Sequence, residues 1–306
     1  MNLLLSHMDS WALDLQARNR AETTISRYRD TILLFSDWQA EHERRLAASA
    51  VRPSHVRDFL RHRQATTSPG TAAIDFRNLR AYFNWLVKEE ELDHGENPMI
   101  KVGAPKVPEK DIPVLEADDI KALVKATAGR SFENRRDRAI ILTLLDNGVR
   151  AGGLVGLRYA PHDDEANDVL LDRGQLRVIL KGGRQTFIPI GPATAAAIDR
   201  YLRERAKHKL SHRKELWLSP KGRLTDSGVR QMLTRRAKAA GIAHVHPHLF
   251  RHTAAHLLKE AGLTEEELMA VCGWESAAMA KRYGRSAAAA RARAAHRRVS
   301  PSDRFA

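Results

Sequence analysis

The run CGWESAAMAKRYGR, residues 272–285, is the most informative part of this 306-residue chain. It places Tyr283 nine positions after Trp274, among basic residues and directly before Gly284. This setting is more polar than that of a usual core aromatic, although a surface position or stacking on a nucleic-acid base also fits the pattern. Tyr283 is therefore a candidate nucleophile.

Basic groups that suit a phosphate precede the tyrosine in the chain. In HLFRH, residues 248–252, His248 and Arg251 are three positions apart on an expected helix, so both side chains point from one face and can converge on one phosphate. Earlier, Asn147-Gly148 is a plausible helix stop just ahead of Arg150. These motifs indicate a site that binds a phosphodiester.

A hairpin and a capped helix complete the set of motifs. QLRVILKGGRQTFIPIG, residues 175–191, has β-branched runs on both sides of Gly182-Gly183, which predicts a hairpin with Lys181 beside its turn. Thr264 and Glu267 form a capping box that opens another helix, which ends just before Trp274. Trp274 is then a candidate hydrogen-bond donor, and burial in the core is the competing interpretation.

Composition names a class of partner. The chain has 51 Lys and Arg against 37 Asp and Glu, a net charge of +14, which favours a polyanion such as nucleic acid. The single cysteine, Cys272, excludes an intrachain disulfide and fits a reducing compartment. No apolar run approaches the length of a membrane span, so we expect a soluble, cytoplasmic protein.

Periodicity predicts a mainly α protein with a small β-sheet (α+β) in two domains. Apolar residues recur at helical spacing through residues 1–98, an expected helical domain, and the proline-rich segment 99–114 is typical of a linker. Residues 115–306 form the second domain, with helices expected over 118–128 and 134–145. Exposed arginines that are candidates for DNA contacts, or simply for solvated helix faces, are Arg27, Arg57, Arg61, Arg77, Arg80 and Arg184.

The order and spacing of these motifs resemble the tyrosine recombinases, the phage-integrase-type family. That family has an arginine after a Gly-x pair, a lysine in a β-hairpin, an H-x-x-R-H motif, a Gly-His or Gly-Trp step, and a tyrosine nine residues later. This chain supplies Arg150, Lys181, the 248–252 motif, Trp274 and Tyr283 in that order. The resemblance implies a helical core-binding (SAM-like) domain and a catalytic domain that form a C-shaped clamp on DNA.

The resemblance also implies an activity, site-specific DNA recombination through a 3′-phosphotyrosyl intermediate and a Holliday junction. Tyr283 would be the nucleophile, Arg150, Arg251 and Trp274 would contact the phosphate, Lys181 would be the general acid and His248 the probable base. Neither a cofactor, nor a metal, nor ATP is implied. The partners would be a double-stranded recombination site and three further copies, or a paired recombinase, with residues 286–298 as an exchange helix.

The chain departs from the family pattern at three positions, of which Trp274 in place of a histidine is a variation that the family itself shows. Family members usually carry Glu or Asp three residues after the first arginine, and this chain has Gly153 there. We therefore expect another carboxylate, or none, to orient Arg150. The hairpin glycine that commonly precedes the lysine is Leu180, while Gly182-Gly183 can still form the turn.

Three alternatives remain at this stage. A metal site is suggested by the histidines between positions 244 and 256, although no H-E-x-x-H motif is present. A type IB topoisomerase uses similar chemistry without site choice, and a non-catalytic relative would only bind its DNA site. The DNA target and the biological setting are left open by the sequence.

Overall fold

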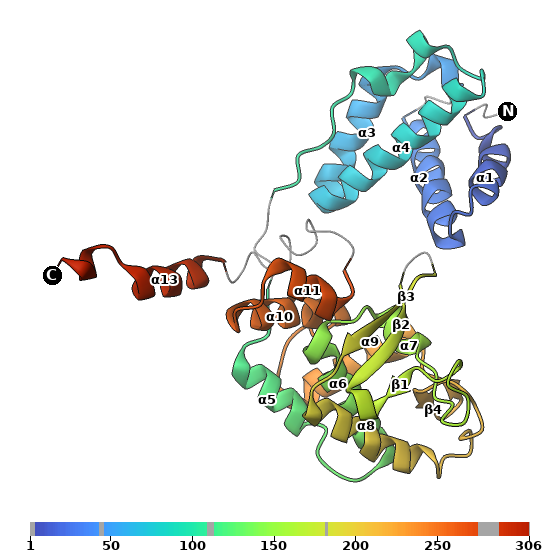
Figure 1. Ribbon diagram of the computed structural model, residues 1–306. Helices are drawn as coiled ribbons and strands as arrows, with labels where there is room; N and C mark the ends of the chain where they lie inside the picture. Colours follow the sequence, from blue (N-terminus) through green and yellow to red (C-terminus); the bar gives the residue numbers. More distant parts are fainter. Residues whose placement is uncertain (1–3, 43–45, 109–112, 181–182, 275–287, 306) are drawn as a thin grey trace. The chain divides into compact units, whose positions relative to one another are not determined.

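The computed structural model describes residues 4–42, 46–108, 113–180, 183–274 and 288–305 (Figure 1). The chain divides into two compact units, residues 1–110 and 111–306. The expected fold class, mainly helical with a small β-sheet, is confirmed. No helix in these described ranges is both long and apolar enough to cross a membrane.

The N-terminal unit is a helical domain with an aromatic core. Proline at the first turn starts two of its helices, and the Ser68 hydroxyl accepts a hydrogen bond from the Thr71 backbone N–H at the start of the last one. Phe35, Phe59 and Tyr82 are completely buried. The elements in this unit are α1 (Met8–Ala17), α2 (Glu22–Glu41), η1 (Ala48–Ala50), α3 (Pro53–Thr66), α4 (Pro69–Lys88), η2 (His94–Glu96) and η3 (Pro98–Lys101).

A buried polar cluster joins three helices of this unit. Nε of Arg63 on α3 lies 2.7 Å from Oδ2 of Asp75 on α4. Thr31 on α2 donates to the same carboxylate, and Asn78 donates to Thr31. Because buried charges are tolerated only when paired, this cluster fixes how the three helices pack.

The C-terminal unit surrounds a small antiparallel sheet with helices. The strands pair in the order β1-β2-β3, with Leu176 opposite Ile188 in the predicted hairpin, and beyond the strands the Leu180 backbone N–H donates to the Arg184 carbonyl at 2.7 Å. The strands are β1 (Val169–Leu170), β2 (Gln175–Ile179), β3 (Gln185–Pro189), β4 (Leu218–Ser219) and β5 (Gly222–Arg223). The helices are α5 (Ala117–Lys125), α6 (Phe132–Asn147), α7 (Ala151–Gly156), η4 (Leu171–Arg173), α8 (Pro192–Arg205), α9 (Asp226–Ala240), α10 (Pro247–Glu260), α11 (Glu265–Cys272), α13 (Ala288–Val299) and η5 (Ser302–Arg304).

Helix α6 is the centre of this unit. It packs against α8 and α10, and Ile140, Ile141 and Leu144 on it are completely buried. The helix extends two residues beyond the expected 134–145 at each end, whereas α5 ends three residues before the expected position 128. The two-residue strands β1, β4 and β5 were not expected from the sequence, because such short strands show no periodicity.

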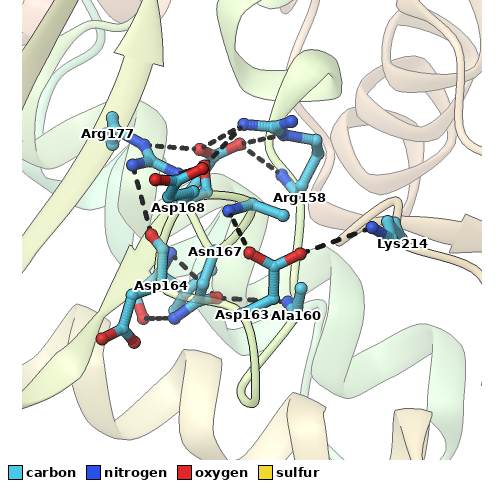
Figure 2. A network of polar contacts seen from close by, with 11 residues as sticks. Arg158, Ala160, Asp163, Asp164, Asn167, Asp168, Arg177 and Lys214 are labelled. Carbon is cyan, nitrogen blue, oxygen red and sulfur yellow. Dashed lines mark hydrogen bonds and ion pairs between the residues drawn. The ribbon is translucent and has the colours of Figure 1, made fainter.

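The carboxylate of Asp168 joins the end of α7 to the sheet (Figure 2). Asp168 is buried directly before β1, and it accepts hydrogen bonds from the Arg158 backbone N–H at 2.8 Å and from the Arg158 Nε at 3.2 Å. Nε of Arg177 on β2 donates to its other oxygen at 2.9 Å. One buried acceptor thus holds cations from two segments, which fixes α7 relative to the hairpin.

A second buried carboxylate is that of Asp137 on α6, and replacing it tests how much such ion pairs contribute to the stability of the unit. Arg136 and Arg236 each approach it within 2.7 Å. Asp137→Asn leaves both guanidinium groups without their counter-charge, so the free energy of unfolding should fall by about 3–5 kcal/mol in urea denaturation. The matched control is Asp118→Asn, which removes the exposed Lys121–Asp118 pair and should leave stability nearly unchanged. If both substitutions changed the free energy of unfolding equally, the buried pairs of Asp137 would not be a main source of stability.

Candidate active site

Arg150 lies at a sharp junction between two helices, as expected. Helix α6 ends at Gly148 in the left-handed conformation (φ 58°), and the Asn147 side chain accepts a hydrogen bond from the Val149 backbone N–H. Arg150 is then the N-cap of α7, and its side chain is exposed. The turn therefore presents the guanidinium to solvent.

The backbone of α10 closely approaches this junction. A Cβ atom at Gly148 would lie 3.1 Å from the Arg251 Cα and 3.3 Å from the Ala254 Cβ. In the space that glycine leaves, Nη1 of Arg251 donates a 2.7 Å hydrogen bond to the Gly148 carbonyl. The contact brings Arg150 and Arg251 to one site although 101 positions separate them in the sequence.

Arg251 is held from its other side by an indole ring. It is only 2% exposed, and its guanidinium carbon lies 4.8 Å from the centre of the Trp274 ring, within the range of a cation–π contact. The capping box of Thr264 and Glu267 is present as predicted, and α11 ends at Gly273, so Trp274 is placed by the end of that helix. Trp274 is buried and presents its ring face to Arg251.

Two neighbouring cavities share both arginines. The first, of about 200 Å³, lies where α7, α9 and α10 begin and is lined by Val149, Arg150, Ala151, Gly152, Asp226, Arg230, Pro247, His248 and Arg251. The second, of about 290 Å³, faces the hairpin and is lined by Val149, Arg150, Gly152, Gly153, Val178, Ile179, Leu180, Ile188, Arg251 and Cys272. Two guanidinium groups on shared walls suit the oxygens of one phosphate.

His248 stands in the first cavity beside these cations. It reaches solvent, yet its ring is partly desolvated, and this desolvation lowers its pKa below the ordinary value. The charges of Arg230, His246 and Arg251 lower the pKa further, while Asp226 acts in the opposite direction. The imidazole is therefore neutral at pH 7 and can accept a proton.

The remaining catalytic candidates, Lys181 and Tyr283, lie outside the described residues. Leu180, the neighbour of Lys181, lines the second cavity. A Cβ atom at Gly273 would lie within 3.5 Å of side-chain atoms of Thr186, Ile188 and Leu180, so the end of α11 packs against the hairpin. Leu180 and Gly273 are thus neighbours at this site.

Cys272 is a buried thiol. Its side chain lines the second cavity but is only 4% exposed, and burial raises its pKa to about 12. The thiol is protonated at neutral pH, so it is a poor nucleophile.

Gly153 contributes no carboxylate, and the carboxylate of the first cavity comes from elsewhere. That residue is Asp226 in the first turn of α9, paired with Arg230. The sequence analysis missed both. Thr225 followed by an acidic residue is a recognisable helix start, but nothing in local sequence links that start to Arg150, because a cavity shared by residues 76 positions apart depends on the tertiary fold.

The arginines proposed to touch DNA are exposed as expected. Five lie on the N-terminal unit, Arg27 on α2, Arg57 and Arg61 on α3, and Arg77 and Arg80 on α4, and the sixth, Arg184, directly precedes β3. Arg61 lies 3.5 Å from Asp58, so part of its charge is balanced. Their exposure is compatible with DNA binding and with solvation alike, and their role stays a prediction.

The histidines of the 244–256 segment serve separate local roles. The His246 side chain caps α10 by accepting the Leu249 backbone N–H, and His256 lies 3.4 Å from Glu260. In the described part of the chain, no three His, Cys, Asp or Glu side chains are grouped so that they could hold a metal ion.

The helical unit, the helix-covered sheet and the paired arginines together define a DNA strand-exchange enzyme of the tyrosine recombinase class. The model of the phage integrase family matches residues 113–290, more than half of the chain, and that of the phage integrase N-terminal SAM-like domain matches residues 8–90. The chain therefore belongs to the phage integrase family.

Individual relatives agree with this family. Tyrosine recombinase XerC of Staphylococcus aureus (strain JH9) is 28% identical over 249 residues, 79% of each chain. The integrase of the Tn1549 transposon, solved with transposon right end DNA, superposes with a TM-score of 0.73 at 18% identity, over 96% of this chain and 99% of that one. XerH recombinase on a palindromic difH substrate gives 0.71 at 16% identity, covering 95% and 84%. At these identities the structural matches establish the fold.

Gly148→Ala tests the junction that brings the two arginines together. Alanine in the left-handed region costs about 1–2 kcal/mol, and its Cβ also presses on the Arg251 backbone. The free energy of unfolding in urea should fall by at least that amount. Gly156→Ala is the matched control, because a Cβ there meets nothing within 4 Å, and it should be neutral or slightly stabilising. If Gly148→Ala lowered the free energy of unfolding no more than Gly156→Ala does, the Arg251 backbone would not approach Gly148 closely.

Proposed function

We propose that this chain is a site-specific recombinase in which Tyr283 attacks a DNA phosphodiester. The observation that carries the proposal is the convergence of Arg150 and Arg251 on shared cavity walls, with a neutral His248 beside them. Two guanidinium groups at one site suit a pentacovalent phosphorus transition state, whose non-bridging oxygens carry the developing charge. The Trp274 ring packs against the Arg251 guanidinium and holds it in place.

The proposed step balances protons and bonds without a cofactor. The phenol oxygen of Tyr283 forms a bond to phosphorus and gives its proton to His248, while the bond from phosphorus to the 5′-oxygen breaks. Lys181 gives a proton to the leaving 5′-oxygen. The 5′-hydroxyl of another strand then attacks the 3′-phosphotyrosyl bond in the reverse sense. The covalent intermediate conserves the bond energy, so resealing requires neither ATP nor a metal ion.

We propose a division of labour along the chain. Residues 1–98 would bind DNA, residues 99–114 would link the two domains, and residues 115–306 would carry out catalysis. The match to the N-terminal SAM-like model over residues 8–90 supports a recombinase over a type IB topoisomerase. The net charge of +14 supports a DNA partner.

The proposed assembly is a tetramer on a double-stranded recombination site, formed by copies of this chain or with a paired recombinase. Lambda integrase, which superposes with a TM-score of 0.70, has been solved as a tetramer bound to a Holliday junction, which supports this stoichiometry. We place such a protein in the cytoplasm with its DNA substrate.

Tyr283→Phe should abolish the covalent protein–DNA adduct, because the substitution removes only the attacking oxygen. Adducts trapped on a nicked substrate are counted on a denaturing gel, and binding is followed by mobility shift, where little change is expected. Tyr159→Phe, at a tyrosine outside both cavities, should form adducts at the wild-type rate. Wild-type adduct yield from Tyr283→Phe would remove Tyr283 as the nucleophile.

Binding to the DNA site should weaken steeply with salt, since phosphate contacts release counterions. Arg57→Gln and Arg80→Gln, at exposed positions on α3 and α4, should each reduce the slope of log K against log[salt] by about one. Fluorescence anisotropy at several salt concentrations measures this slope. Lys121→Gln on α5, whose ammonium already pairs with Asp118, is the control. Unchanged slopes in both arginine variants would show that α3 and α4 do not contact phosphates.

A further inference from the structure

We propose that Asp226 is a positioning residue of this active site: its ion pair with Arg230 at the wall of the first cavity fixes this third cation beside His248. The inference rests on the proposed function, because it assigns a role within that catalytic site.

The start of α9 places this pair. The Thr225 hydroxyl accepts the Gly228 backbone N–H and caps the helix, which puts Asp226 in its first turn. Nε of Arg230, one turn later, lies 2.6 Å from Oδ1 of Asp226. This distance is that of a strong charge-assisted hydrogen bond, so the guanidinium has a fixed direction rather than a free one.

Of the described side chains that line the two cavities, Asp226 is the acidic one. The first cavity brings it together with Arg150, Arg230, His248 and Arg251. Among the described residues that line the second cavity none is acidic, and Gly153 stands there with the Val149 side chain and the Ile179 carbonyl as its neighbours. The carboxylate that shares the first cavity with these cations therefore comes from α9.

In the described part of the chain, the charged groups around His248 come from three segments. Asp226 and Arg230 come from α9, His246 and Arg251 from α10 and the residue before it, and Arg150 from the turn before α7. Arg230 lowers the pKa of His248 and Asp226 raises it. The pair thus sets both the direction of a third cation and the proton affinity of the imidazole.

An exposed i,i+4 pair on a helix ordinarily contributes only about 0.3–0.5 kcal/mol to stability. The side chains of Asp226 and Arg230 are 44% and 50% exposed, so helix stability alone gives the pair little importance. What distinguishes it from the similar Asp199–Arg203 pair on α8 is its place in the arginine-lined cavity. That second pair is the matched control.

The experiment compares Asp226→Asn, Arg230→Gln, the double variant and Asp199→Asn in the full chain. Nuclear magnetic resonance titration of the His248 ring, without DNA, should show the pKa falling in Asp226→Asn and rising in Arg230→Gln. Asp199→Asn should leave it unchanged. The opposite directions are the signature, since a general loss of structure would move both single variants the same way.

The second readout is the rate of covalent adduct formation across pH. Asp226→Asn should slow it by about tenfold at neutral pH, because Arg230 loses its orientation, and the acid limb should move to lower pH. In Arg230→Gln the acid limb should move to higher pH. The double variant should lose less than the product of the two single losses, since both substitutions break one interaction.

The outcomes separate this inference from the function on which it rests. If the wild-type chain forms no adduct with any DNA, the proposed function fails, whatever the titrations show. If the wild-type chain forms adducts but Asp226→Asn matches Asp199→Asn in both His248 pKa and rate, the positioning role is overturned. A changed pKa with a wild-type rate and pH profile overturns it as well.

Discussion

The close approach of α10 to Gly148 is the contact on which the site depends. Gly148 ends α6 in a left-handed turn, and the missing Cβ lets the Arg251 backbone come near enough for its side chain to bond the Gly148 carbonyl. The turn then directs Arg150 into the cavities that Arg251 already lines. A single backbone geometry thus defines where two distant parts of the chain present their positive charges.

Local signals in the sequence predicted the parts that are themselves local. The Gly182-Gly183 pair predicted the hairpin, Thr264 and Glu267 predicted the start of α11, and Gly148 predicted the end of α6, because turns and caps depend on a few neighbouring residues. The positions of Lys181 and Tyr283 stay predictions. The two-residue strands were not predicted, because strands this short show no periodicity.

The electrostatic character of the site could not be read from sequence. The spacing of motifs predicted that Arg150, His248 and Arg251 belong to the site. Asp226 and Arg230 lie in no recognisable motif, so the sequence did not predict their part in it. Their closeness to His248 follows from how α9 and α10 start at the same cavity, and that is a property of packing. The departure at Gly153 showed that a carboxylate was missing without indicating which helix supplies one.

The different surroundings of the two arginines bear on how such a gene decays. Arg251 is buried, bonds a backbone carbonyl and rests on an indole, so its loss damages the protein itself. Arg150 is exposed at the start of a helix, and its replacement leaves the core intact. A copy released from selection for strand exchange can drift at position 150 and still fold, whereas position 251 remains constrained. We therefore expect inactive descendants of such a gene to keep the arginine at position 251 and to lack the one at position 150.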